Sequence, residues 1–242
     1  MLTLDQVTFR YKDNFVLDDV SYQFIKGRTY TIVGALDSGK SVFLKIVAGL
    51  VNPTNGEVSF FGESFFERKR DREIRKRIAF VFQDGVLLSN LTIQEHFYLP
   101  MKYLLTDKDK VALDEMINEM LKELNIDKDY LNKRPCEVPS SVRKMINFSI
   151  AFLMEPEVLI VDGPLSNLNK PEREIILKKL KRYKATGGTM ILSGNSERVI
   201  RELADEVICI GDAKIKFSLP ANHFFERDDS VLKEFILREI GD

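Results

Sequence analysis

Residues 29–50 read TYTIVGALDSGKSVFLKIVAGL, and this stretch decides the fold. Its first five residues, 29–33, form an apolar and β-branched run that predicts a short buried strand. Residues 34–41, GALDSGKS, match the pattern G-x-x-x-x-G-K-[ST] at every required position. From 40 to 50 the apolar side chains recur at helical spacing, and Gly49 is suited to end the helix. The stretch therefore predicts a strand, a glycine-containing loop and a helix in succession.

The loop at 34–41 is suited to hold polyphosphate. Its backbone N–H groups can point inward, and the helix N-terminus adds positive potential. Lys40 is expected to reach the β- and γ-phosphates of a nucleotide, and Ser41 to ligate Mg²⁺. ATP and Mg²⁺ are thus the expected cofactors, with contacts from Gly34, Asp37, Ser38, Gly39, Lys40, Ser41 and Val42.

Asp37 places a carboxylate in a loop built for anions. Its short side chain tolerates the left-handed backbone that a glycine would adopt there. Two interpretations stay open: the carboxylate faces solvent, or it repels phosphate and lowers the affinity for ATP.

A second buried strand, VLIVD at 158–162, ends in Asp162. A parallel strand would carry this carboxylate to the edge of the sheet where ligands bind, and there it can hold Mg²⁺, often through water. The next residue is Gly163, so no second acid follows.

Strand and helix patterns alternate at both ends of the chain, whereas the middle is helical. The fold class predicted is α/β: a phosphate-loop, RecA-like core with a mostly parallel sheet, N-terminal antiparallel strands and an inserted helical subdomain. We expect the core at 1–83 and 155–219, the helical subdomain at 84–154 and a C-terminal helical tail at 220–242. The expected strands are 2–9, 16–24, 78–82, 158–162, 189–193 and 206–210, with a hairpin at 52–64; the expected helices are 40–50, 92–103, 107–125, 145–154, 171–183, 197–204 and 228–240.

Composition narrows the function classes. The chain has 242 residues, a net charge of −1, and 44% hydrophobic and 30% charged residues, which is an ordinary soluble balance. The charged cluster at 67–77 mixes both signs, which favours a solvated helix face over a nucleic-acid surface. The two cysteines and two histidines are isolated and show no zinc spacing. No stretch reaches the roughly 18 apolar residues of a membrane span, and no signal pattern opens the chain, so we expect a cytoplasmic protein.

Together these features resemble the ATP-binding subunits of ABC transporters along nearly the whole chain. The resemblance implies that GALDSGKS is the phosphate loop and that FVFQD (80–84) is the glutamine loop, whose Gln83 contacts Mg²⁺ and senses the permease. It also implies that Tyr11 stacks on adenine and that SNLN (166–169) crosses a dimer interface. Mg²⁺ would then be held by Ser41, Gln83 and Asp162.

Two segments look most like the subunit of Mla-type lipid-transport systems: residues 83–100 and the tail at 227–236. The family resemblance implies two partners, a membrane permease and a second ATP-binding subunit in a homodimer or heterodimer, and a peripheral position on the inner face of the cell membrane. The tail helix would pack on its own core or on the dimer partner. A groove for a permease helix is expected from apolar residues that could equally be core: Val86, Leu87, Leu88, Leu91 and Ile93.

Three positions depart from the family pattern. Gly163 stands where a glutamate polarises the attacking water, and Gly194, followed by Asn195, stands where a histidine is usual. The signature segment LSGGQ is replaced by VPSSV at 138–142. Pro139 offers neither a hydroxyl nor an N–H, and serines replace two glycines that allow close backbone approach. In a head-to-tail dimer these changes would weaken both nucleotide sites.

The sequence thus predicts a subunit that binds MgATP but hydrolyses it poorly, with no catalytic residue intact. Two alternatives stay open. The chain could be a fully active transport ATPase in which another acid, Asp84 or Glu197, acts as the base. It could instead be a regulatory nucleotide-binding module without a role in transport. The glutamine loop argues against a phosphate-loop kinase.

Overall fold

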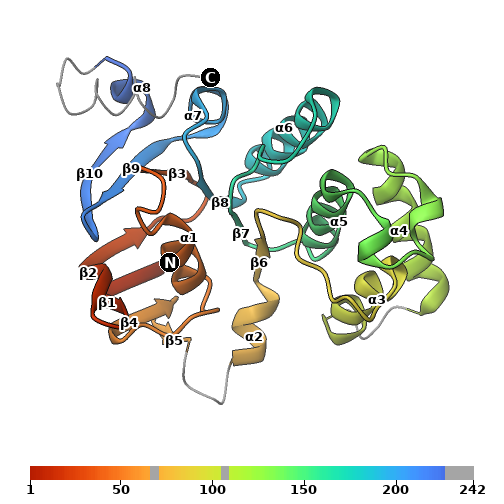
Figure 1. Ribbon diagram of the computed structural model, residues 1–242, viewed down its shortest axis with the longest axis horizontal. Coiled ribbons are helices and arrows are strands. Elements are labelled where there is room, and N and C mark those ends of the chain that lie inside the picture. Colours follow the sequence, from red (N-terminus) through yellow and green to blue (C-terminus); the bar gives the residue numbers. More distant parts are fainter. Residues whose placement is uncertain (66–70, 105–108, 227–242) are drawn as a thin grey trace.

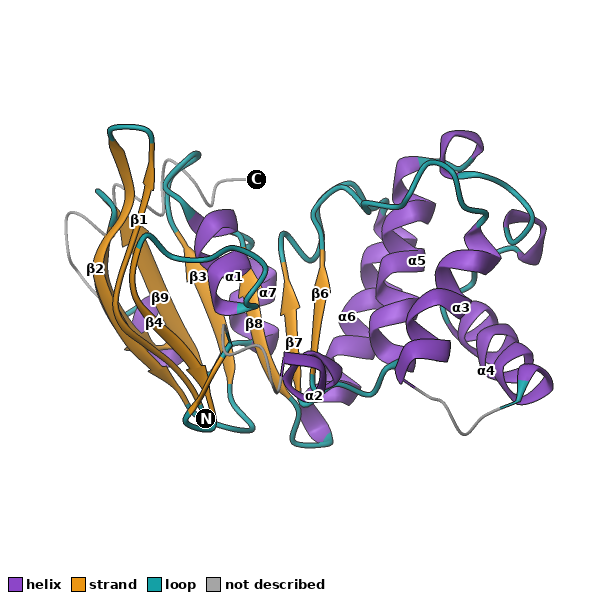
Figure 2. Cartoon of the chain, turned by 90° about the horizontal axis from the view of Figure 1, so that it is seen from below, coloured by secondary structure: helices purple, strands orange, loops and turns teal. Residues whose placement is uncertain are grey.

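The computed structural model of the protein describes residues 1–65, 71–104 and 109–226, and the side chains of residues 71, 72, 103 and 104 are not described. The helix expected at 228–240 and the start of the charged cluster at 67–77 lie outside the described residues. The described chain forms two β-sheets with a helix between them and a group of helices at one end of the molecule (Figures 1 and 2). None of these described helices combines the length and the apolar character that a bilayer span needs.

The larger sheet has six strands in the order β10-β9-β3-β8-β7-β6. Neighbouring strands from β9 through β3, β8 and β7 to β6 pair parallel, whereas β10 pairs with β9 antiparallel. Continuous apolar runs give β3, β7 and β8, which are buried at every residue, because helices or the second sheet cover both faces of a parallel sheet. The bounds are β3 Thr29–Val33, β6 Ile78–Val81, β7 Val158–Val161, β8 Thr189–Ser193, β9 Glu206–Gly211 and β10 Lys214–Pro220.

The smaller sheet is antiparallel, with the order β2-β1-β4-β5. Helix α1 (Lys40–Val47) lies between the two sheets (Figure 2), and a shared core contains Phe24 from β2, Tyr30 from β3 and Phe43 from α1. The Phe24 ring meets the Tyr30 ring edge-on with 4.9 Å between centroids. The phosphate loop is therefore anchored on both sides by packed elements. The bounds are β1 Leu2–Tyr11, β2 Asn14–Phe24, β4 Asn55–Phe60 and β5 Glu63–Ser64.

The helical region contains α3 (Ile93–Leu104), α4 (Lys110–Glu123) and α5 (Ser140–Leu153), with 3-10 turns at Lys128–Tyr130 and Pro135–Glu137. Its apolar side chains share one core with β6, β7, β8 and α6 (Lys170–Ala185). The expected core and helical regions are thus continuous in their packing. Three shorter helices complete the described chain: α2 (Asp71–Lys76), α7 (Glu197–Leu203) and α8 (Ala221–Phe224).

One local prediction was wrong, and one strand was missed. Helix α5 begins at Ser140, five residues before the expected start at 145, because the apolar periodicity begins only at Met145 whereas the backbone is helical directly after Pro139. Strand β10 was not expected. It is an edge strand, and the alternation of polar and apolar residues in KIKFSL at 214–219 was a strand signal that the sequence analysis overlooked.

Candidate nucleotide-binding site

The phosphate loop connects β3 to α1 at the carboxyl edge of the larger sheet. Asp37 has a φ of 60° and Gly39 a φ of 93°, so both adopt the left-handed backbone that the loop requires. The ammonium group of Lys40 donates to the carbonyl oxygens of Gly34 at 2.7 Å and Ala35 at 2.6 Å. The loop thus folds around its own lysine.

A cleft of about 590 Å³ opens beside this loop. It brings together eleven of the residues expected in or near the site: Tyr11, Asp37, Ser38, Gly39, Lys40, Ser41, Val42, Gln83, Asp162, Gly163 and Gly194. Gly34 is not part of the lining. Its N–H and C=O groups instead bond the side-chain amide of Asn195 at 3.2 and 3.1 Å, which ties the start of the loop to the end of β8. Tyr11, at the end of β1, is 67% exposed and lines the cleft.

Asp162 is buried directly after β7, as the strand pattern predicts. The Ser193 hydroxyl donates to Asp162 Oδ1 at 2.5 Å and accepts the N–H of Gly163 at 3.0 Å. Ser193 and Asn195 were missed as site residues. The rule that predicts the place of Asp162 would have found them, because the carboxyl ends of neighbouring parallel strands meet at one edge.

The carboxylates that line the cleft, among the described residues, are those of Asp37 and Asp162. The two acids considered as substitutes for a glutamate at position 163 lie elsewhere. Asp84 accepts a hydrogen bond from the side-chain amide of Asn167 at 3.0 Å, and Glu197 pairs with Arg201 at 2.6 Å within α7. Neither acid lines the cleft.

Lys144 is a charged residue that the sequence analysis missed. Its side chain is fully buried near the start of α5, and its ammonium group donates to Gly163 O, to Ser166 O at 2.9 Å and to Ser166 Oγ at 2.6 Å. Burial lowers the pKa of Lys144 to about 8, and the negative charges of Asp162 and Asp84 oppose this shift. A lone lysine ahead of an apolar helix face was the only signal in the sequence.

The family model described as "ABC transporter" matches residues 17–166, more than half of the chain. The chain belongs to the ABC transporter family. Among curated proteins, the lipoprotein-releasing system ATP-binding protein LolD of Buchnera aphidicola is 29% identical over 201 residues, which cover 80% of this chain and 87% of LolD. The nickel import ATP-binding protein NikE of Shigella flexneri is 28% identical, covering 85% of this chain and 78% of NikE.

The macrolide export ATP-binding/permease protein MacB of Haemophilus ducreyi is 32% identical over 83% of this chain, but the matched part is only 29% of MacB. The solved structure of the dimeric bacterial ABC transporter cassette MJ0796 superposes with a TM-score of 0.83 at 24% identity, covering 91% of this chain and 99% of the cassette. This likeness confirms the α/β cassette fold, in which one sheet is mostly parallel and the other is antiparallel.

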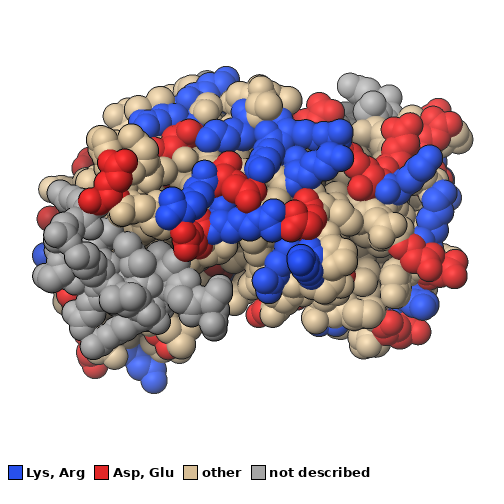
Figure 3. All heavy atoms as spheres, turned by 90° about the horizontal axis from the view of Figure 1, so that it is seen from above, with Lys and Arg blue, Asp and Glu red and all other residues tan. Residues whose placement is uncertain are grey.

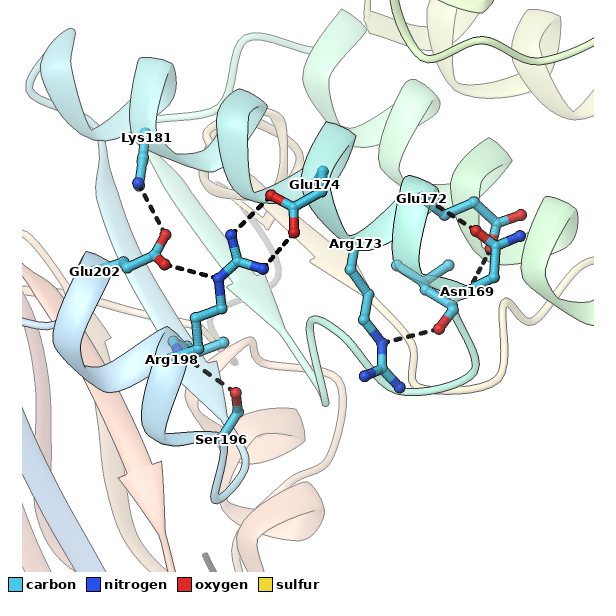
Figure 4. A network of polar contacts seen from close by, with 10 residues as sticks. Asn169, Glu172, Arg173, Glu174, Lys181, Ser196, Arg198 and Glu202 are labelled. Carbon is cyan, nitrogen blue, oxygen red and sulfur yellow. Dashed lines mark hydrogen bonds and ion pairs between the residues drawn. The ribbon is translucent and has the colours of Figure 1, made fainter. Parts of the chain in front are cut away.

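The segment at 138–142, expected at the place of the family signature, lies at the start of α5. Pro139 immediately precedes α5, and Val138 is buried. The Ser141 hydroxyl donates to Glu172 Oε1 at 2.9 Å. Glu172 also closes a capping box with Asn169 at the start of α6 (Figure 4). This serine is therefore engaged within its own chain.

The five apolar residues expected in a permease groove divide between surface and core. Val86 and Leu88 are 59% and 53% exposed, Leu87 and Leu91 are partly buried, and Ile93 is buried in the core. A cavity of about 280 Å³ is lined by Val86 and Leu87 together with residues of α3 and α5. The imidazole of His96 holds this segment by accepting the N–H of Leu88 at 2.7 Å.

Basic side chains gather on the face formed by α6 and α7 (Figure 3). Acidic side chains are interspersed among them. Arg198 pairs with Glu174 and Glu202, and Lys181 pairs with Glu202 at 2.8 Å (Figure 4). This face is therefore a network of opposite charges rather than the concentrated positive footprint that phosphate-backbone binding needs.

Proposed function

We propose that this chain is an ABC transporter subunit that binds MgATP, docks on a membrane permease and hydrolyses ATP slowly or not at all. The cleft carries this proposal. It gathers the phosphate loop, Gln83 and Asp162, yet Gly163 follows Asp162 and the only other lining carboxylate among the described residues is Asp37 in the loop. The binding half of the site is thus present beside an altered catalytic half.

The donor set of the cleft fits Mg²⁺. The hydroxyl of Ser41, the amide oxygen of Gln83 and the carboxylate of Asp162 are hard oxygen ligands of the kind this ion takes together with water and phosphate oxygens. When bound, the ion would be held by these three side chains and would neutralise negative charge on the polyphosphate. Lys40 supplies a second positive charge at the phosphates, and the exposed ring of Tyr11 supplies a stacking face for the base.

The groups that would help water attack the γ-phosphate are altered. A positioned general base contributes roughly 10²–10⁴ in rate. At the two places where the family carries a glutamate and a histidine, Gly163 and Gly194 bring no side chain. Ser193 and Asn195 lie nearby, but both are hydrogen-bonded to the protein itself, and neither is a base near neutral pH. Slow turnover follows.

Assembly with a second ATP-binding subunit, of the same or another kind, is part of the proposal. In a head-to-tail pair this chain would give its partner the segment 138–142, in which Ser141 is bound to Glu172. Both sites of the pair would then be impaired. We assign residues 1–83 and 155–219 to the nucleotide-binding core, 84–154 to the helical subdomain and 220–242 to the tail, with the assembly on the inner face of the cell membrane.

The proposed cargo is a lipid, as in Mla-type systems. This part rests on the likeness of residues 83–100 to those subunits. The names of the relatives span lipoprotein release, macrolide export and nickel import, so they do not select a cargo.

The test measures nucleotide binding and turnover on one purified sample. We expect saturable MgATP binding at or below millimolar concentration and turnover far below about 1 s⁻¹, the lower end of common enzyme rates. Lys40→Ala should abolish binding. If turnover reaches about 1 s⁻¹ and disappears in Lys40→Ala, the chain is an active ATPase and the proposed impairment is wrong.

Docking on a permease is tested at Leu88. Leu88 is 53% exposed and directly follows Leu87, which lines the cavity at α3 and α5, so Leu88→Asp should release the subunit from its membrane complex without unfolding it. Val111→Asp is the matched control, since Val111 is an apolar residue that is 66% exposed on α4 and does not belong to the segment expected to form the groove. Equal recovery of both variants in the membrane fraction would refute the groove.

A further inference from the structure

The loop that follows Asp162 is folded around the ammonium group of Lys144. Gly163 O accepts hydrogen bonds from Lys144 Nζ, from the Ser166 hydroxyl at 2.8 Å and from the Ser166 amide at 3.1 Å. Lys144 also donates to Ser166 O and Ser166 Oγ. An ammonium group has three N–H donors, and these three acceptors satisfy all of them.

This turn leaves no room for a side chain at position 163. Gly163 has a φ of 58°, and a Cβ atom added there would lie 2.7 Å from Ser166 Oγ and 3.3 Å from Ser166 Cβ. A serine hydroxyl could normally rotate away from such a contact at small cost. Here it is held in place, because Lys144 donates to it at 2.6 Å while it donates to Gly163 O.

The same hydrogen bonds extend to the carboxylate of Asp162. The backbone of Gly163 is held on both sides, since its N–H donates to Ser193 Oγ and its carbonyl oxygen accepts from Lys144. Ser193 in turn donates to Asp162 Oδ1. Lys144, Gly163, Ser193 and Asp162 therefore form one continuous chain of contacts that ends at the residue placed to hold Mg²⁺.

A lysine that served only to fill this position would lower the stability of the fold. Burying an ammonium group costs free energy unless its hydrogen bonds are satisfied, and an apolar side chain would fill the space at lower cost. All three hydrogen bonds of Lys144 within the described residues go to the loop at 163–166. Gly85 also packs its backbone against Arg143 and Lys144, so the loop at 83–85 approaches the same point.

We propose that Lys144 is a positioning residue that locks the 163–166 loop in a turn closed to any side chain at position 163 and that orients Asp162 through Gly163 and Ser193. The second half of the proposal rests on the proposed function, in which Asp162 holds Mg²⁺. A consequence is that Gly163→Glu alone cannot place a carboxylate in the cleft, because the turn at 163–166 has no space for a side chain at position 163.

The lock is tested by a double-mutant cycle on the full chain, using urea unfolding. Gly163→Ala should lower the folding equilibrium constant about a hundredfold: about tenfold from the left-handed backbone and the rest from the contact with Ser166. In a Lys144→Gln background the hydroxyl can rotate, so the same substitution should cost only about tenfold. Gly187→Ala is the matched control, because Gly187 has a φ of 81° and nothing within 4 Å of an added Cβ, and it should cost about tenfold in both backgrounds.

Equal costs of Gly163→Ala in the two backgrounds, within about threefold, overturn the lock. If Lys144→Gln does not fold, Ser166→Ala replaces it in the cycle, because it removes the atom that Lys144 holds. An unchanged hundredfold cost in that background overturns the lock equally.

The orientation of Asp162 is tested by ATP binding with and without Mg²⁺. Lys144→Gln should raise the Mg²⁺ concentration that gives half of the metal-dependent gain in ATP affinity about tenfold, as for other outer partners of a metal ligand, while the affinity for metal-free ATP stays unchanged. A parallel loss of both affinities would show a merely structural role. If the wild-type chain binds no ATP at millimolar concentration, the proposed function fails, whereas the unfolding cycle still decides whether the loop is locked.

Discussion

Two threonines on neighbouring strands of the larger sheet should respond in opposite ways to the same substitution. Thr31 on β3 and Thr189 on β8 are both fully buried. The Thr31 hydroxyl has no hydrogen-bond partner among the described residues, whereas the Thr189 hydroxyl accepts the N–H of Gly27 at 2.9 Å. Valine has nearly the shape of threonine, so Thr→Val at each position isolates the hydroxyl.

The magnitude follows from what each hydroxyl does. A buried hydroxyl without a partner costs about 1–3 kcal/mol relative to an apolar group, so Thr31→Val should raise the free energy of unfolding by about 1–2 kcal/mol. Thr189→Val leaves the Gly27 N–H without its acceptor, and because Gly27 is only partly buried we expect a loss of about 0.5–1.5 kcal/mol. In a chain of this size each kcal/mol shifts the melting temperature by roughly 2–4 °C.

The assay is urea unfolding followed by far-ultraviolet circular dichroism, because the chain has no tryptophan. The midpoint should move up for Thr31→Val and down for Thr189→Val with an unchanged slope, which shows that only stability has changed. β3 leads into the phosphate loop, yet Thr31 does not line the cleft, so MgATP affinity should stay the same in Thr31→Val. Destabilisation by Thr31→Val, or equal shifts in the two variants, would refute the reasoning.

Three further predictions concern other parts of the chain. Cys136 is exposed and should react with a thiol reagent at once, whereas Cys209 is buried and should react only on unfolding. Burial raises the pKa of the Cys209 thiol to about 11, so about a thousandth of it is ionised at pH 8. Two rapidly modified thiols in the mass spectrum of the folded chain would contradict this. Glu123→Gln should cost less than about 1 kcal/mol, and this difference should vanish in 1 M NaCl, since Glu123 forms surface ion pairs with two basic residues of α6. The ion pair with Lys179 lowers the pKa of Glu123, so its contribution to stability is present above the ordinary carboxyl pKa and is lost as the pH falls through the lowered pKa. A stability difference between wild type and Glu123→Gln that persists below that pH would contradict the ion-pair explanation. His96→Leu should lower the free energy of unfolding by about 0.5–1.5 kcal/mol, because the N–H of the exposed residue Leu88 loses its acceptor. An unchanged urea midpoint would show that this bond contributes nothing.

The sequence alone determined the elements that build the cleft. The strand at 29–33, the phosphate loop and the strand at 189–193 lie where their patterns predicted them, and Asp162 follows its strand as expected. Buried parallel strands appear as uninterrupted apolar runs, and a loop that holds phosphate needs fixed residues at fixed spacing. Both signals are local, so a single amino-acid sequence is enough to find them.

Only the tertiary structure decided what surrounds that framework. Ser193 and Asn195 could be placed at the sheet edge from the sequence, but their hydrogen bonds to Asp162 and Gly34 could not, and nothing in the local sequence of Lys144 indicates which loop it meets. The early start of α5 was missed because residues 140–143 are polar or only partly buried and show no apolar period of their own, whereas the alternation at 214–219 that forms β10 was present in the sequence and was overlooked. Local sequence encodes the period and the turns, whereas a buried ammonium is tolerated only where distant carbonyl oxygens converge on it, and that convergence exists only once the chain is folded.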